Sequence, residues 1–308
     1  MYSPIIIFVY NRADHFEQTY NALSKCAEAK NSELYIFSDG PKNENAVGGV
    51  NEVRNKLESI KNKGDFRCVT ITESEENKGL ALSIITGVSS VLKKHGRAII
   101  LEDDSIVAPS FLCFMNRALD EFENEKRVGA VAGYTPEFTF PTDYKEDIFT
   151  SYRSCSCGWA TWNDRFDNVD WQLDEIGEFY KNREMIKKFN SSGTDRFVRL
   201  YRQTQGNGSS WSVRFGLHLV RNDMLTVYPR YSYIQNIGCD ETGVHSRAED
   251  AETMKVDLSK AIESPEIHFV SPDKRIEKTM KKHYSAGMVS EIKRRLAMEY
   301  ILIKGKKK

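Results

Sequence analysis

The chain has 308 residues, of which 40 % are hydrophobic and 29 % are charged. This composition supports a sizeable core and argues against wholesale disorder. Lys and Arg together number 44, as do Asp and Glu, so the balanced charge predicts no nucleic-acid partner. The balance is uneven along the chain, because residues 274–308 contain twelve Lys or Arg and three Glu.

The six cysteines do not form a zinc motif. Cys155 and Cys157 are close, but their C-x-C spacing lacks a second pair of ligands. Cys26, Cys68 and Cys113 lie in apolar patterns and are expected to be small buried residues with reduced thiols. The first apolar run is not typical of a signal peptide, and no apolar stretch reaches the ~20 residues of a membrane span. We therefore expect a cytoplasmic protein.

The first 135 residues alternate between short apolar runs and helical patterns. Helices are expected at 13–30, 51–61, 79–95 and 109–125. Strands are expected before, between and after them, at 4–10, 34–38, 68–72, 98–101 and 128–132. This order predicts an α/β fold with a mostly parallel central sheet flanked by helices.

The regular alternation ends near residue 135. Residues 136–260 are rich in aromatic, Gly and polar residues and are expected to form a less regular half of the same domain that shapes a pocket. Residues 261–308 form a basic tail, with an amphipathic helix expected from residue 275. Two readings of 275–308 stay open. The helix lies on an anionic membrane surface, or it packs on the body with a solvated face.

Polar residues follow four of the expected strands. They are Asn11 with Arg12, Asp39, the segment 73–78, and the triplet 102–104. Ligands of open parallel sheets bind at the carboxyl ends of the strands, so these residues are expected to gather at one site. Solvated loops explain one polar strand end, but four together favour a binding site.

The triplet Glu102-Asp103-Asp104 is the sharpest feature. Three adjacent carboxylates repel one another unless a cation joins them, and Mg²⁺ or Mn²⁺ prefers carboxylate and phosphate oxygens. A metal that bridges two phosphates also neutralises a departing diphosphate. The alternative is a capping cluster for the helix near Pro109. The chain contains neither a Gly-x-Gly-x-x-Gly nor a P-loop motif, which argues against dinucleotide oxidoreductases and nucleotide-hydrolysing motors.

Taken in order, these motifs resemble those of bacterial family-2-type glycosyltransferases of the A-type fold, related in layout to N-acetylglucosaminyltransferase I. The resemblance spans residues 4–247. Besides the first two strand ends, it rests on NKGL at 77–80, EDD at 102–104, GWATW at 158–162 and QNIGCDETGVH at 235–245.

The resemblance implies transfer of a sugar from a nucleoside diphosphate, usually a uridine nucleotide, to an acceptor hydroxyl. It makes residues 1–135 the nucleotide-sugar-binding half and residues 136–260 the acceptor-side half of one catalytic domain, and it implies a role for each matched residue. Donor-binding roles fall on Asn11, Arg12, Asp39, Lys78, Gly79, Glu102, Asp103, Trp159 and Gly243. Among these, Asp39 would bind the base, Trp159 would lie below the donor sugar, and the loop at Gly243 would close over the diphosphate. Asp104 would bind Mn²⁺ or Mg²⁺, and His245 would be either a second ligand or a structural residue.

The catalytic base is the open point. An inverting enzyme needs a base near the acceptor hydroxyl, and Ser209 stands where the resembled pattern has an Asp. Asp240 and Glu241 are the first candidates. Asp164 and Asp195 are others, although Asp195 precedes a helical run and suits a cap.

The leading hypothesis is a metal-dependent, inverting glycosyltransferase that acts on a glycan or lipid-linked acceptor in bacterial surface polysaccharide assembly, at the inner face of the membrane. Its partners are the nucleotide sugar and that acceptor. A nucleotidyltransferase would need a Gly-rich, basic loop after the first strand, which this chain lacks. The second reading, kept open by Ser209, is a nucleotide-sugar or glycan binding protein that has lost catalysis.

Overall fold

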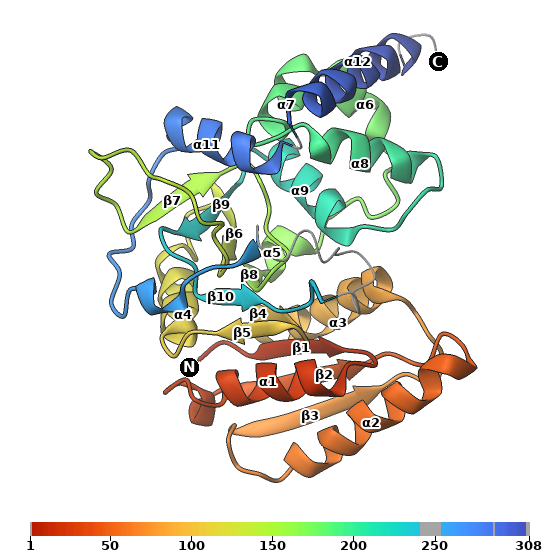
Figure 1. Ribbon diagram of the computed structural model, residues 1–308, viewed down its shortest axis with the longest axis vertical. Coiled ribbons are helices and arrows are strands. Elements are labelled where there is room, and N and C mark those ends of the chain that lie inside the picture. The colour runs from red at the N-terminus through yellow and green to blue at the C-terminus, as the bar shows by residue number, and fades with distance from the viewer. Residues whose placement is uncertain (1, 241–253, 286, 306–308) are drawn as a thin grey trace.

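The computed structural model describes residues 2–240, 254–285 and 287–305. Its centre is an eight-stranded sheet in the order β3-β2-β1-β4-β8-β6-β9-β7, and a separate ribbon pairs β10 with β5 (Figure 1). The strands are β1 Ile5–Val9, β2 Glu33–Ser38, β3 Cys68–Glu73, β4 Arg97–Glu102, β5 Ser105–Val107, β6 Val128–Ala132, β7 Ile148–Ser151, β8 Trp159–Trp162, β9 Leu225–Pro229 and β10 Ile234–Asn236.

Helices cover both faces of this sheet and build a separate end of the molecule (Figure 1). They are α1 Ala13–Leu23, α2 Glu44–Ile60, α3 Leu80–His95, α4 Phe111–Glu121, α5 Asn163–Phe166, α6 Ile176–Lys181, α7 Arg183–Phe189, α8 Asp195–Thr204, α9 Trp211–Arg221, α11 Lys274–Tyr284 and α12 Met288–Gly305, with 3₁₀ turns at Ala29–Asn31 and Leu258–Lys260. No helix in the described ranges is long and apolar enough to cross a membrane.

The pairing confirms the mostly parallel α/β sheet expected from the sequence. β1 runs parallel to β2 and β4, β2 to β3, and β6 to β9. β8 runs antiparallel to both β4 and β6, and β7 runs antiparallel to β9. Because β8 lies between β4 and β6, one continuous sheet combines strands from before and after residue 135.

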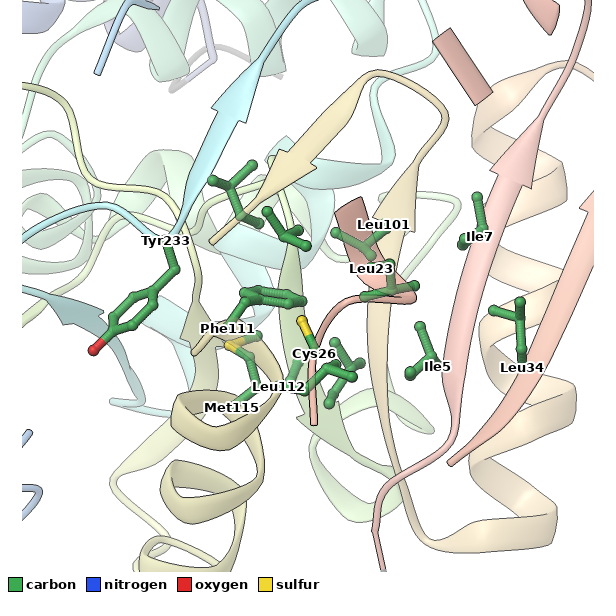
Figure 2. Packing of buried hydrophobic residues seen from close by; sticks show 14 of the residues in the cluster. Ile5, Ile7, Leu23, Cys26, Leu34, Leu101, Phe111, Leu112, Met115 and Tyr233 are labelled. Carbon is green, nitrogen blue, oxygen red and sulfur yellow. The ribbon is translucent and has the colours of Figure 1, made fainter. Parts of the chain in front are cut away.

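Successive residues of β1 face opposite sides of the sheet, and both sides are buried. Ile5 and Ile7 point toward α1, α2 and α4, and Figure 2 shows them beside Leu23 and Leu101 in that layer. Ile6 and Phe8 point the other way, toward α3 and α9. The apolar run of this strand therefore serves two layers of core.

Two smaller clusters stabilise the rest of the chain. One joins α6, α7, α8 and α9 to the end of α12. In the other, Ile276 and Met280 of α11 pack beside Ala132, Phe149 and Tyr228, which come from β6, β7 and β9. The expected single basic helix from residue 275 is thus two helices, each with one face packed on the body.

Several boundaries differ from the expectation. α1 ends at Leu23, and the chain then turns so that Cys26 and Ala29 enter the core. α2 begins at Glu44, seven residues before the expected start. Gly49 therefore lies within the helix and not in a loop. It allows the helix to pack closely, since a Cβ at this position would lie 2.7 Å from the carbonyl oxygen of Asn11. Cys68, expected to be buried, lies exposed on the edge strand β3.

The half after residue 135 is more regular than its composition suggests. It contributes β7, β8 and β9 to the central sheet and carries four consecutive helices, α6 to α9. Strands β5 and β10 have three residues each, too few to produce a periodic pattern. The ribbon that they form was therefore not predicted, although it positions the candidate site.

Candidate functional site

Two of the predicted strand ends meet at one cluster of charged side chains. β1 and β4 are neighbours, with Phe8 opposite Glu102, so Arg12 emerges beside the acidic triplet. The Arg12 guanidinium donates hydrogen bonds from Nη2 to Asp103 Oδ1 and, at 2.9 Å, to Asp104 Oδ2. The structure thus brings together three residues that the sequence placed at a common edge.

Burial controls the protonation of this cluster. Asp103 is 4 % exposed and Asp104 is 8 % exposed. Burial raises the pKa of Asp103 to about 6, although the charge of Arg12 acts in the opposite direction. Burial, followed by the charges of Asp104 and Asp103, raises the pKa of Glu102 to about 8. Burial alone would lower the pKa of Arg12, but the two aspartates outweigh it and raise that pKa. A cation bound beside these carboxylates would favour their ionised forms and lower the raised pKa values.

The β5–β10 ribbon brings a distant segment onto Asp104. β10 pairs antiparallel with β5 so that Asn236 lies opposite Ser105. The Asn236 side chain donates from Nδ2 to Asp104 Oδ1 at 2.9 Å, and the Ile237 N–H donates to the Asp104 carbonyl oxygen at 2.9 Å. Side chain and backbone of Asp104 are thus both held from residues 236–237.

Gly238 completes this contact. A Cβ at this position would lie 2.1 Å from Asp104 Oδ2 and 3.0 Å from Arg12 Nη1, so no larger residue fits without moving the carboxylate. The Gly238 N–H donates to Asn236 Oδ1 at 3.0 Å, which also fixes the amide that holds Asp104. The sequence motif at 235–245 includes both residues, but it does not reveal these roles.

Thr19 and His15 of α1 also belong to the site, and the sequence analysis missed both. Thr19 Oγ1 donates to the carbonyl oxygen of Asp103 at 2.8 Å and accepts from the N–H of Ser105 at 3.0 Å, so it holds the backbone of the triplet. His15 Nε2 lies 3.0 Å from Asp240 Oδ2, and this aspartate is the first base candidate. Neither residue lies in a sequence motif. Both reach the site only because they lie on the face of α1 that is directed toward it.

Asp240 lies at the edge of this cluster, with 42 % of its side chain exposed. The other proposed base and loop residues, Glu241, Gly243 and His245, lie outside the described residues. Of the four motif residues 240, 241, 243 and 245, the structure therefore locates only the first.

Asp39 organises a neighbouring group at the end of β2. Its Oδ1 accepts from the N–H groups of Gly40 at 3.0 Å and Lys78 at 2.8 Å. Its Oδ2 accepts from Asn77 Nδ2 at 3.1 Å and from the N–H of Gly79 at 2.8 Å. The structure thus joins Asp39 to the predicted turn at 77–80, and the carboxylate holds the backbone of that turn. The Asn11 and Lys78 side chains are exposed.

Trp159 does not lie in a pocket, and the expectation that its ring faces a donor sugar is wrong. The side chain is 1 % exposed and lies in β8. Its ring stacks on Trp211 at a centroid distance of 4.8 Å and also packs against Phe166 and Phe215. Trp162, at the other end of β8, is also buried, with 2 % of the residue exposed. The two rings lie in the core layers on opposite faces of the sheet.

The remaining base candidates have other partners. Asp195 accepts two hydrogen bonds from Arg153, at 3.0 and 2.9 Å, in a largely buried ion pair. Asp164 pairs with Lys126 and Arg165 at the start of α5. Ser209 is exposed just before α9. Asp240 is therefore the described carboxylate best placed beside the charged cluster.

The donor atoms are compatible with a metal bound mainly through its substrate. Within the described ranges, no three His, Cys, Asp or Glu side chains are grouped to hold a metal ion. Each carboxylate oxygen has two lone pairs, and each oxygen of Asp104 uses one, on Arg12 or Asn236. One carboxylate plus diphosphate oxygens is a common arrangement for Mg²⁺.

A pocket of about 320 Å³ opens in the half after residue 135, at the small end of the range for ligand sites, ~300–1,000 Å³. Its walls include the aromatic rings of Phe138, Phe140 and Tyr231, together with Arg230 and Lys260. Ser232, also on its wall, stands four residues before Asn236. This separation corresponds to about 13 Å of extended chain.

Comparison with known proteins found no matching family model and no matching curated protein. Among solved structures, S. aureus TarS 1-349 is similar with 12 % identity and a TM-score of 0.44, over 76 % of this chain and 60 % of that one. A second S. aureus TarS structure has the same identity and TM-score, over 78 % of this chain and 38 % of its own. The chain thus spans less than two thirds of either TarS chain.

A structure from Bacillus anthracis, assigned as a glucose-1-phosphate thymidylyltransferase and solved in complex with a sucrose, is also similar. The identity is 12 % and the TM-score is 0.34, over 59 % of this chain and 83 % of that one.

Proposed function

We propose that this protein is a metal-dependent, inverting glycosyltransferase that moves a sugar from a nucleoside diphosphate, with UDP as the expected nucleotide, to an acceptor hydroxyl. The proposal rests above all on Arg12, Asp103 and Asp104, which converge at the carboxyl ends of β1 and β4 where Asn236 and Gly238 close over them. The motif order that resembles A-type glycosyltransferases supports the same chemistry.

In this proposal, the two aspartates have different tasks. Asp103 accepts hydrogen bonds from hydroxyls of the ribose and the donor sugar, and Thr19 keeps its backbone in place. Asp104 would hold Mn²⁺ or Mg²⁺ together with the diphosphate, and the ion would neutralise the charge of the leaving nucleotide. Arg12 offsets the two carboxylates and adds positive charge beside the diphosphate.

The turn held by Asp39 forms the nucleotide end of the site. Asp39 fixes the N–H groups of Lys78 and Gly79 toward itself, which leaves the exposed Lys78 side chain available to the nucleotide. All four lone pairs of Asp39 accept hydrogen bonds within the protein, so the predicted contact with the base would replace one of these bonds, such as the bond from Asn77.

Asp240 serves as the general base. It removes the proton from the acceptor hydroxyl, the hydroxyl oxygen then forms a bond to the anomeric carbon, and the bond from that carbon to the phosphate oxygen breaks with inversion. His15, 3.0 Å from the carboxylate, orients it. Glu241 is the alternative base.

The acceptor is a glycan, carried on a lipid during bacterial surface polysaccharide assembly, which would bring the enzyme to the inner face of the membrane. The pocket beside Tyr231 supports a sugar-containing acceptor, because aromatic faces suit the apolar faces of sugars and the charged groups around it offer hydrogen bonds. Tyr231→Ala is expected to raise the acceptor KM and to leave donor hydrolysis unchanged.

A nucleotide-sugar binding protein without catalysis is the second candidate. It is favoured by Ser209, which is exposed and cannot act as a base. Binding of a nucleotide sugar without turnover, followed by activity in Ser209→Asp, would support this candidate.

Donor hydrolysis across a panel of UDP- and GDP-sugars, with Mn²⁺ or with a chelator, tests the main proposal. The wild type is expected to release nucleotide from one donor in a metal-dependent reaction that Asp104→Ala abolishes. The proposal is wrong if no nucleotide sugar binds. If hydrolysis persists in the presence of the chelator, only the proposed metal dependence is wrong.

A further inference from the structure

Helix α12 carries apolar residues on two opposite faces. One face packs on the body through Ile301 and Leu302, which are 8 % and 1 % exposed. The other face is a stripe of five large residues that are between 51 % and 68 % exposed: Val289, Ile292, Leu296, Tyr300 and Ile303. Their spacing of three or four residues aligns them along one side of the helix. A helix that packs by one face usually turns a polar face outward, so the stripe is unusual.

The stripe is also unusual for this molecule. Ten large hydrophobic residues are exposed among the residues that the structure describes, and five of them lie on this helix. Single exposed hydrophobic residues need no explanation, but a contiguous patch marks a surface that meets a partner or a membrane.

A basic pocket lies between the two C-terminal helices. Its volume is about 490 Å³, and its walls come from the end of α11 and the start of α12. Lys278, Lys281 and Lys282 line it, together with Ser285 and Glu291. The three ammonium groups suit a phosphate, whereas the Ser285 hydroxyl already donates to the carbonyl oxygen of Lys281 at 2.7 Å. α11 and α12 lie at the same end of the molecule, away from β1 to β3 (Figure 1).

The acidic side chains of these two helices are already engaged by the chain itself. Glu277 accepts from Ser191 at 3.0 Å, Glu291 accepts from Arg295 at 3.1 Å, and Glu299 accepts from Arg183 at 2.8 Å. α11 and α12 together carry nine Lys or Arg against these three glutamates, so this surface keeps a positive balance.

We propose that this end of the molecule docks on a bilayer of anionic lipids. The stripe of α12 enters the boundary between headgroups and acyl chains, and the lysine pocket binds lipid phosphate. Charge argues against a second copy as the occupant, because two copies would bring the same lysines and arginines face to face. The proposal extends the proposed function, since it places the enzyme beside a lipid-linked acceptor, but its test does not depend on transfer.

Vesicle flotation of the full chain tests the proposal, with phosphatidylcholine alone or mixed with phosphatidylglycerol. The wild type is expected to float with the anionic vesicles only. Lys278→Gln/Lys281→Gln/Lys282→Gln should weaken this binding by about 100-fold, and Ile292→Ser/Leu296→Ser by more than about tenfold. The matched controls are Lys25→Gln/Lys30→Gln/Lys61→Gln and Leu82→Ser, which remove exposed charges and an exposed leucine elsewhere.

Three results would overturn the proposal: no flotation of the wild type, equal flotation of the stripe variant, or a wild-type dimer that Ile292→Ser/Leu296→Ser converts to a monomer. Donor hydrolysis is measured on the same samples. Hydrolysis without flotation rejects the docking surface alone, and flotation without binding of any nucleotide sugar rejects the proposed function alone.

Discussion

Asn236 donates a 2.9 Å hydrogen bond to Asp104, a residue 132 positions earlier in the chain. This bond connects the acidic triplet at the end of β4 to the last residue of β10, and the β5–β10 ribbon sets its geometry. The candidate site is therefore built jointly by the two halves of the chain. It depends on contacts that can be removed without touching the triplet itself.

Gly238→Ala tests whether the close approach to Asp104 matters for function. The added Cβ would lie 2.1 Å from Asp104 Oδ2, so the carboxylate must move. We expect donor hydrolysis to fall by about tenfold or more, because displacements near 1 Å disturb catalytic geometry. Gly177→Ala is the control, since its Cβ would meet nothing within 4 Å. Equal hydrolysis by both variants and the wild type would exclude this role.

Arg12→Ala tests the charge balance of the cluster. The substitution leaves two buried carboxylates without their partner and is expected to cost about 3 kcal/mol of stability. Mn²⁺ should recover part of this loss, because it can replace the missing positive charge. Thermal unfolding with and without Mn²⁺ measures both effects. If Mn²⁺ stabilises wild type and variant equally, the ion does not replace the charge of Arg12, and if it stabilises neither protein, the carboxylates do not bind it.

Glu277→Gln tests a buried carboxyl group that links α11 to the body. Burial raises the pKa of Glu277, even though the hydroxyls of Ser191, Ser151 and Ser192 donate to it and act in the opposite direction. The unfolded chain loses this proton near pH ~4.3, whereas the folded chain keeps it to a higher pH. The wild type therefore loses stability as the pH rises from the pKa of the unfolded chain to that of the folded chain, by about 1.4 kcal/mol per pH unit between them.

The glutamine variant has no such proton to lose. Its stability relative to the wild type should increase as the pH is raised from about 4 through the range in which the folded wild type loses its proton, as measured by denaturant unfolding at each pH. Glu277→Leu removes the acceptor of the hydroxyls and should cost about 1–3 kcal/mol throughout this range. A pH-independent difference between Glu277→Gln and the wild type would show that Glu277 titrates alike in both states.

Trp159→Leu separates core packing from sugar recognition. The ring is enclosed by Phe166, Trp211 and Phe215, so its loss should cost about 3 kcal/mol and lower the Tm by roughly 5–10 °C. The donor KM should not change, because the ring is buried. A higher donor KM at an unchanged Tm would restore the interpretation of Trp159 as a pocket residue.

The sequence predicted those parts of the fold that depend on local patterns. β1 and β4 are apolar runs ending in charged residues, so both strands and the position of Asp103 and Asp104 at a common edge could be expected. The early start of α2 could not, because Gly49 is required by a contact with Asn11 and not by the local backbone. β5 could not either, since its partner lies more than 120 residues away.

The candidate site was predictable in the same uneven way. Arg12 and the triplet lie at the ends of apolar strands, and this position is what allowed the sequence to predict them as site residues. The contributions of Thr19 and Gly238 arise only from three-dimensional proximity. Trp159 was wrongly assigned because a buried aromatic residue and a pocket aromatic residue look the same in a sequence.

The place of β8 in the sheet has a consequence for biosynthesis. β4 and β6 are made first, yet the strand between them is residues 159–162, which leave the ribosome later. The nascent chain up to residue 135 thus has an unfilled position between two hydrophobic strands. We expect its sheet to close only once β8 has emerged, so the two halves of the chain fold as one cooperative unit and neither is a separable module.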